Sequence, residues 1–246
     1  MKLIRSAFYF LSLLLIFAYT PSSNNDDGKD RPVQAKDHQL YPVISNTIAA
    51  EPGEYRKWNL QAAGLSYTAF KMAMKGYQFF LQKNMLYNSN LLTIIDYSQP
   101  SSHKRLYVLD MRSGKILFNT LVAHGRNSGY NYATEFSNDE ESHKSSLGFY
   151  ITLDTYTGTN GYSLKLKGCE KGINDNAIDR AIVFHGADYV SESFIRNNGY
   201  LGRSYGCPAV PVTMHKKIID KIKNGSCMFL YYPAKNYLSS SKILDS

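Results

Sequence analysis

A histidine and a cysteine in the second half of the sequence are the residues best suited to chemistry. His185 ends the apolar run 181–184, and Cys207 lies between Gly206 and Pro208. Cysteine attacks as the thiolate, and a nearby imidazole can lower the thiol pKa and hold the proton. Either residue alone would more often be structural. Together they predict a nucleophile, Cys207, with His185 as its base.

The loop around Cys207 has the composition of a tight, stiff turn. Gly206 allows close approach of a substrate backbone, and Pro208 fixes the next φ angle. Such a turn can aim the amide N–H groups of Gly206 and Cys207 at a developing oxyanion. We therefore expect these two N–H groups to form the oxyanion hole.

The remaining cysteines and histidines have plainer interpretations. Cys169 and Cys227 lie in strand-like surroundings, and we expect small core residues or, as an alternative, a disulfide pair. His124 follows a strand-like run, so it could line the cleft or belong to a turn. We expect the other four histidines at the surface: His38, His103, His143 and His215. Because no His-x-x-x-His or Cys-x-x-Cys spacing occurs, we expect no metal and no cofactor.

The first residues predict an export signal over 1–20. Lys2 and Arg5 precede a short apolar run at 7–18, and small and polar residues follow. The run is too short to span a bilayer comfortably, so we expect membrane contact only through this signal. The polar segment 21–39 predicts a flexible linker. These features predict an exported protein of the periplasm or cell envelope.

Composition bounds the remaining possibilities. A chain of 246 residues can bury one sizeable core and a small accessory unit. The formal charge of +8 permits attraction to an acidic partner. However, the lysines are scattered and form no basic stripe interleaved with aromatic residues, which favours an ordinary solvated surface. We therefore expect no nucleic-acid or nucleotide partner.

The elements that must position the cysteine and the histidine are mainly strands. Apolar residues at one helical face between Leu65 and Phe79 predict a helix within an N-terminal helical segment, 40–90, that caps the main domain. A domain at 91–235 and a tail at 236–246 follow. The turn 111–114 predicts a hairpin, and within the domain only 213–223 has a helical pattern. Strands are predicted at 91–97, 105–110, 115–123, 147–153, 162–166, 181–185 and 228–232. The pattern predicts a mainly β fold, an antiparallel sandwich or partly closed barrel, with an N-terminal helical cap and a C-terminal helix.

These motifs resemble the murein L,D-transpeptidase catalytic-domain family. The resemblance rests on His-Gly-Ala at 185–187 and on Gly-Arg-Ser-Tyr-Gly-Cys-Pro-Ala at 202–209, the cysteine loop of a GRSxGCPA branch. It extends upstream through 136–138, 145–150, 156–158 and 174–175, and it covers roughly 91–233. Tyr205 replaces the histidine usual in the wider superfamily, and Pro208 and Ala209 replace its aliphatic-arginine pair.

The resemblance implies an enzyme that acts on peptidoglycan stem peptides, as donor and as acceptor, without metal or nucleotide. It implies Cys207 as nucleophile and His185 as base, with the imidazole oriented by the carbonyl of Gly186. We expect Arg203 to bind a substrate carboxylate in place of the missing arginine, on its charge alone. Ser204, Tyr205 and His124 complete the expected substrate-binding set.

Three functions remain open at this point. Transfer of the thioacyl group to an amine of a second stem would make the protein an L,D-transpeptidase, the favoured reading. Release by water would make it an L,D-carboxypeptidase that trims tetrapeptide stems. A wall-binding protein of the same fold without catalysis is the third, although intact Cys207 and His185 argue against it. Papain-like peptidases place the cysteine before the histidine, whereas here His185 comes first.

Overall fold

A computed structural model describes residues 53–246, and the structural statements below concern that part of the chain. The predicted export signal (1–20), the predicted linker (21–39) and the start of the helical segment (40–52) lie outside the described residues. Within 53–246, no helix is both long enough and apolar enough to cross a bilayer.

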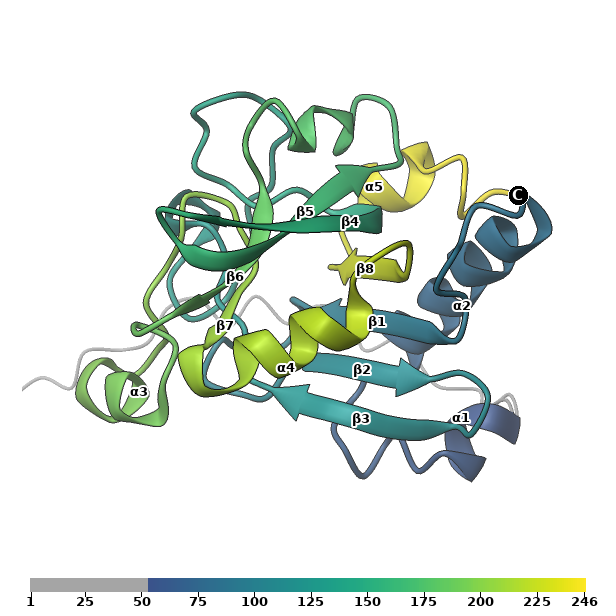
Figure 1. Ribbon diagram of the computed structural model, residues 1–246, viewed down its shortest axis with the longest axis horizontal. Helices are drawn as coiled ribbons and strands as arrows, with labels where there is room; N and C mark the ends of the chain where they lie inside the picture. Colours follow the sequence, from purple (N-terminus) through teal and green to yellow (C-terminus); the bar gives the residue numbers. More distant parts are fainter. Residues whose placement is uncertain (1–52) are drawn as a thin grey trace, which may run out of the picture. The chain divides into compact units, whose positions relative to one another are not determined.

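Eight strands form one strongly bent sheet (Figure 1). Its order is β3-β2-β1-β8-β4-β5-β6-β7, and the pairs β1–β8 and β6–β7 are parallel while the others are antiparallel. The strands are β1 (Leu91–Asp96), β2 (Leu106–Asp110), β3 (Lys115–Thr120), β4 (Gly148–Gly158), β5 (Gly161–Gly168), β6 (Val183–Ala187), β7 (Ala209–Pro211) and β8 (Cys227–Tyr231).

The two ends of the sheet approach each other. Ala123, just after β3, donates its N–H to the carbonyl of Ala209 in β7 at 2.8 Å. The register also shifts within the β2–β3 and β4–β5 pairs, and such irregularities bend strands. The sheet is therefore nearly closed, and the prediction of a mainly β, partly closed barrel is confirmed.

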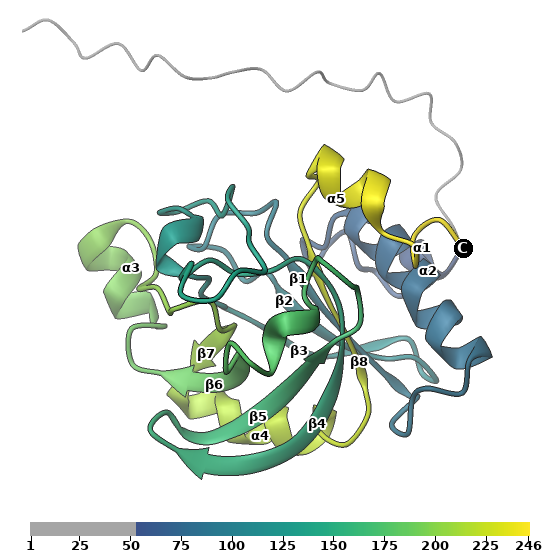
Figure 2. The ribbon, with the colours of Figure 1, turned by 90° about the horizontal axis from the view of Figure 1, so that it is seen from above.

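Helix α2 (Tyr67–Gln82) covers one face of the sheet beside β1 and β8 (Figures 1 and 2). Ser66 caps its start by accepting the N–H of Ala69 at 3.2 Å. A Cβ atom on Gly76 would lie 2.1 Å from the ring of Phe149, so only glycine allows this close packing. The predicted helix is confirmed, and the short α1 (Gly53–Lys57) precedes it.

Of two other helices, one was predicted and one was not. Helix α4 (Val212–Ile222) lies where 213–223 was predicted, but α3 (Glu192–Asn198) was missed, so the expectation of a single helix in the domain was wrong. Because α3 buries none of its residues, it produces no apolar periodicity. Its cap residues Ser191 and Gly199 were the available signal.

The last residues pack onto the sheet instead of trailing from it. Helix α5 (Lys235–Ser240) buries Tyr237, and Ile243 and Leu244 are buried after it. The hydroxyl groups of Tyr237 and Ser241 both donate to the buried carboxyl of Glu170, which also accepts the N–H of Phe149. Burial raises the pKa of Glu170. This segment therefore belongs to the core of the described domain.

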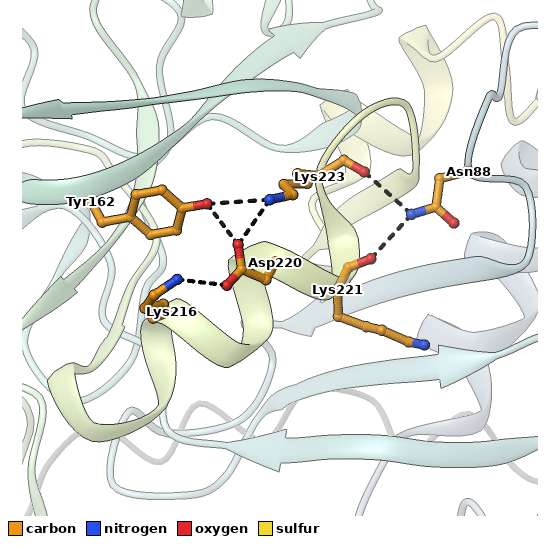
Figure 3. A network of polar contacts seen from close by, with 6 residues as sticks. All are labelled: Asn88, Tyr162, Lys216, Asp220, Lys221 and Lys223. Carbon is orange, nitrogen blue, oxygen red and sulfur yellow. Dashed lines mark hydrogen bonds and ion pairs between the residues drawn. The ribbon is translucent and has the colours of Figure 1, made fainter.

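A surface network links α4 to Tyr162 on β5 and to Asn88 (Figure 3). Asp220 accepts from Lys216 and Lys223, each at 2.9 Å, and from the hydroxyl of Tyr162 on β5 at 2.7 Å. The amide of Asn88 donates to the carbonyls of Lys221 and Lys223 at the end of the helix. Exposed ion pairs of this kind contribute little to stability.

Candidate active site

Strand β6 presents His185 at its middle, with the imidazole buried and oriented. The Nδ1 atom lies 2.9 Å from the carbonyl oxygen of Gly186, the contact that the family resemblance implies. This bond assigns the proton to Nδ1, which leaves the lone pair of Nε2 free to accept one. On the opposite face, a Cβ at Gly186 would lie 2.7 Å from the ring of His215, so glycine is needed there.

The backbone of the cysteine loop leads into a strand that lies next to the strand of the histidine, because β6 and β7 pair in parallel. His185 is the register partner of Ala209, and its N–H points to the carbonyl of Pro208 at 3.4 Å. Cys207 therefore enters the site directly before β7. Its sulfur accepts the N–H of Val183 at 3.4 Å and its S–H donates to the carbonyl of Ala181 at 3.7 Å.

Burial favours the neutral form of both candidate catalytic groups. It raises the pKa of the Cys207 thiol, although the N–H of Val183 and the charge of Arg180 oppose that rise. Burial also lowers the pKa of His185, and nearby His215 lowers it further, while the bond to Gly186 opposes both. The net direction of the thiol pKa is therefore upward, whereas an imidazolium partner was expected to lower it.

The cysteine loop is held by the hydroxyl of Ser204. That hydroxyl accepts the N–H of Gly206 at 3.1 Å and donates to the carbonyl of Cys207 at 2.6 Å. Gly206 has a φ of 126°, a conformation that favours glycine. One expected oxyanion donor, the N–H of Gly206, is thus occupied by Ser204. The other, the N–H of Cys207, lies close enough to its own sulfur to lower the thiol pKa.

The side chain of Arg203 binds the neighbouring loop at 126–130. Its guanidinium donates to the carbonyls of Arg126 and Gly129 at 3.2 and 3.1 Å. It also lies over the ring of Tyr130 at 4.3 Å and near that of Tyr200 at 5.6 Å. These contacts give Arg203 a part in holding the two loops together, which its charge alone did not predict.

His124 is fully buried beneath this loop. Its Nδ1 atom lies 2.7 Å from a guanidinium nitrogen of Arg105, and its Nε2 atom lies 3.3 Å from the carbonyl of Gly129. Burial and the charge of Arg105 lower the pKa of His124 to about 3. We therefore interpret His124 as a neutral structural residue, the plainer of its two sequence interpretations, and not as a substrate-binding one.

Tyr205 is the exposed member of the expected substrate-binding set. Its side chain is 64% exposed, whereas Ser204 is 7% exposed. The guanidinium carbon of Arg126 lies 4.9 Å from the centroid of the Tyr205 ring. The centroid of the His143 imidazole lies 4.5 Å from the same ring centroid. Three side chains on different loops therefore gather at the surface next to the cysteine loop.

An apolar cavity of about 200 Å³ lies at the start of β6. Ala181 and Val183, the two residues whose backbone groups bond the sulfur of Cys207, line it together with Tyr156 and Ile178, whereas Cys207 itself does not. Ala181 has a left-handed φ of 52°, a strained conformation that is concentrated at functional sites.

The other cysteines are remote from this chemistry. Cys169 and Cys227 are free thiols, so the disulfide alternative is not formed in this structure. Burial raises the pKa of Cys169 to about 12 and raises that of Cys227 as well. Within residues 53–246, no three His, Cys, Asp or Glu side chains gather closely enough to hold a metal ion.

Two charged residues near the site were missed by sequence reasoning. Arg105 is completely buried under His124, and Arg180 precedes the turn into β6. Neither belongs to a recognisable motif, and an isolated arginine is normally assigned to the surface. The one available signal was the position of Arg180, shortly before the apolar run that ends in His185.

The pKa directions predict a pH dependence. We expect the rate constant for alkylation of Cys207 in the free protein to inflect above about pH 8.5, the usual thiol value, because burial disfavours the thiolate. The acid limb of kcat/KM should inflect below about pH 6.5, because burial disfavours the imidazolium and the base must be neutral. A pH series of both rates checks this, and an alkylation inflection below pH 8 would contradict it.

Several solved structures show distant similarity. An L,D-transpeptidase from Mycobacterium smegmatis matches 58% of this chain and 59% of its own, with 12% identity and a TM-score of 0.36. An L,D-transpeptidase from Xylanimonas cellulosilytica matches 58% of this chain and 60% of its own, with 14% identity and a TM-score of 0.34.

The helical cell shape determining protein Pgp2 from Campylobacter jejuni matches 71% of this chain and 62% of its own, with 15% identity and a TM-score of 0.38. The matched region thus spans less than two thirds of each of these chains. No curated protein matches the sequence. The sequence model of the L,D-transpeptidase catalytic domain matches residues 61–231, which is most of the chain. The protein therefore belongs to the L,D-transpeptidase catalytic-domain family.

Proposed function

We propose that the protein is a cell-wall acyltransferase that forms a thioacyl intermediate on Cys207 and cross-links peptidoglycan stems. The observation that carries the proposal is the pairing of β6 with β7. It brings the loop that carries the buried Cys207 next to the strand that carries His185, and the bond from His185 Nδ1 to the carbonyl of Gly186 supports Nε2 as the base. Membership of a family that acts on peptidoglycan supplies the substrate class.

The first step acylates the enzyme. The thiol of Cys207 gives its proton to Nε2 of His185 as sulfur attacks the carbonyl carbon that follows the third stem residue. The carbon–nitrogen bond to the terminal D-residue then breaks. The departing amine takes the proton from His185, and a thioester remains on Cys207. Because both groups start neutral, His185 acts as a general base during attack and does not hold a preformed ion pair.

The second step returns the enzyme to its starting state. An amine from a second stem attacks the thioester carbon and gives its proton to His185. The carbon–sulfur bond breaks, the amide cross-link forms, and the proton returns to the sulfur of Cys207. In both steps the N–H of Cys207 is the nearest oxyanion donor. The N–H of Gly206 can join it only after leaving the hydroxyl of Ser204.

Export to the envelope is part of the proposal. It rests on the sequence of residues 1–20 and on the location of the family's substrate. An acceptor amine is abundant within the wall, which favours transfer over hydrolysis.

The test is a defined tetrapeptide donor incubated with and without an amine acceptor, with products followed by mass spectrometry. A cross-linked dimer that increases with acceptor concentration supports the transpeptidase. Tripeptide as the sole product at every acceptor concentration would identify an L,D-carboxypeptidase. Neither product, with Cys207 unmodified, would favour a wall-binding protein. The Cys207→Ala protein is the matched blank.

A further inference from the structure

Arg180 ties a long loop to the site. Its guanidinium donates to the carbonyl of Ser137 at 2.8 Å and to the hydroxyl of Ser146 at 2.5 Å. Its other terminal nitrogen donates to the carbonyl of Lys144 at 2.7 Å and to the hydroxyl of Ser142 at 3.2 Å. All four partners lie in the segment 137–146, which the planar guanidinium therefore gathers onto one side of the barrel.

The same guanidinium lies against the cysteine loop. A Cβ atom on Gly206 would be 3.3 Å from a terminal nitrogen of Arg180 and 2.8 Å from the carbonyl of Lys144. The adjacent Ser145 donates its hydroxyl to the carbonyl of Gly206 at 3.0 Å. The residue before the nucleophile is thus packed directly on the arginine and on the loop that the arginine holds.

No carboxylate within residues 53–246 forms an ion pair with Arg180. The ion pairs found in the described region all involve other residues, and Asp139 acts on Arg180 only at longer range. Oxygen atoms of neutral groups accept its hydrogen bonds instead. A half-buried cation held in this way keeps its field available to a developing anion nearby.

We propose that Arg180 is a positioning residue for the nucleophile: it clamps the segment 137–146 against the cysteine loop and gives the Cys207 thiolate a fixed cationic neighbour. This inference rests on the proposed function only in taking Cys207 as the nucleophile.

The electrostatic surroundings of the sulfur agree with this role. Arg180 lowers the pKa of Cys207, and Cys207 in turn raises that of Arg180. The other titratable groups that face the sulfur are neutral. Burial raises the pKa values of Tyr97 and Tyr189 to about 12, and burial keeps His185 uncharged. Among the side chains that shift the pKa of Cys207, Arg180 is thus the one that carries a permanent charge.

The experiment uses the full chain and iodoacetamide, a neutral reagent, with labelling of Cys207 followed by peptide mass spectrometry across a pH series. In Arg180→Gln we expect the inflection to move up by about one pH unit, since a close opposite charge shifts a pKa by that amount or more. Below the inflection, labelling should slow about tenfold. In Arg180→Lys the inflection should stay within about half a unit, because the charge remains. Exposed Arg112→Gln is the matched control and should show no shift.

Two safeguards make the labelling experiment interpretable: the fold of Arg180→Gln is checked by circular dichroism, and Arg180→Lys is measured as well. An unshifted inflection in a glutamine variant with native circular dichroism would overturn the proposal. If Arg180→Gln does not fold, Arg180→Lys decides. In Arg180→Lys, a lower transfer rate with an unchanged alkylation inflection supports both the clamp and the role of its charge. An alkylation inflection raised by a full pH unit or more in Arg180→Lys rejects the role of charge. Labelling needs no peptidoglycan, so failure of the proposed function would be seen separately, in the transfer assay alone.

Discussion

Alanine in place of Cys207 is expected to abolish acyl transfer. The thiol is the group that forms the covalent intermediate, and loss of a nucleophile from a catalytic unit lowers kcat by roughly 10⁶-fold. Intact-protein mass spectrometry should show no thioacyl adduct, and cross-linked product should fall to the level of the uncatalysed reaction. The variant should retain its fold, because the remaining contacts of the loop run through Ser204 and Gly206.

Cys169→Ala and Cys227→Ala are the matched controls for this result. Both thiols are distant from the bonds that define the site, and burial raises the pKa of each. Both variants should keep transfer activity. Cys227 is fully buried in β8, so its truncation should lower the free energy of unfolding by about 1 kcal/mol through a small cavity. An adduct on Cys207→Ala, or loss of chemistry in either control, would reject the assignment of the nucleophile.

Methionine in place of Arg105 is expected to produce a large loss of stability. The fully buried guanidinium donates to the carbonyls of Val122 and Gln99 and contacts Nδ1 of His124. It also lies over the ring of Tyr97 at 4.9 Å. Methionine fills similar space but leaves three buried acceptors without a donor, each at a cost of about 1 kcal/mol or more. We therefore expect the free energy of unfolding to fall by roughly 3 kcal/mol.

Urea denaturation measures this change. Arg112→Met, at an exposed position in the β2–β3 turn, is the matched control and should change the free energy of unfolding by less than about 0.5 kcal/mol. The loop above His124 is held through the same network, so transfer activity should fall at temperatures where the variant is still folded. If Arg105→Met lowers the free energy of unfolding by less than about 1 kcal/mol, the buried cation makes no net contribution to stability.

The sequence predicted the elements whose signals are local. Apolar spacing located α2, and alternating runs around the 111–114 turn located the β2–β3 hairpin. The position of His185 at the end of an apolar run, followed by the Cys207 loop, correctly suggested neighbouring elements. These features are encoded within a few residues of where they act, and periodicity or turn chemistry is enough to detect them.

The missed features depend on contacts between distant segments. Strand β7 has three residues, too few for a periodic signal, yet its pairing with β6 brings the loop of Cys207 next to the strand of His185. The aromatic neighbours of Arg203 and the burial of His124 arise from loops that meet only in the folded state. The upward direction of the Cys207 pKa could not be predicted for the same reason: burial of the site, which sequence does not display, is the largest cause of both pKa directions.

The position of β8 in the sheet has a consequence for how the chain folds. The strand is the last in the sequence, yet it lies between β1 and β4, pairing in parallel with one and antiparallel with the other. Until residues 227–231 are in place, the part of the sheet with β1–β3 and the part with β4–β7 lack the strand that pairs with both, although Ala123 still bridges to Ala209 at their far edges. Contacts of such large sequence separation slow folding into the millisecond-to-second range typical of high contact order. Until β8 pairs with both of its neighbours, the edges of β1 and β4 stay open to pairing with other chains.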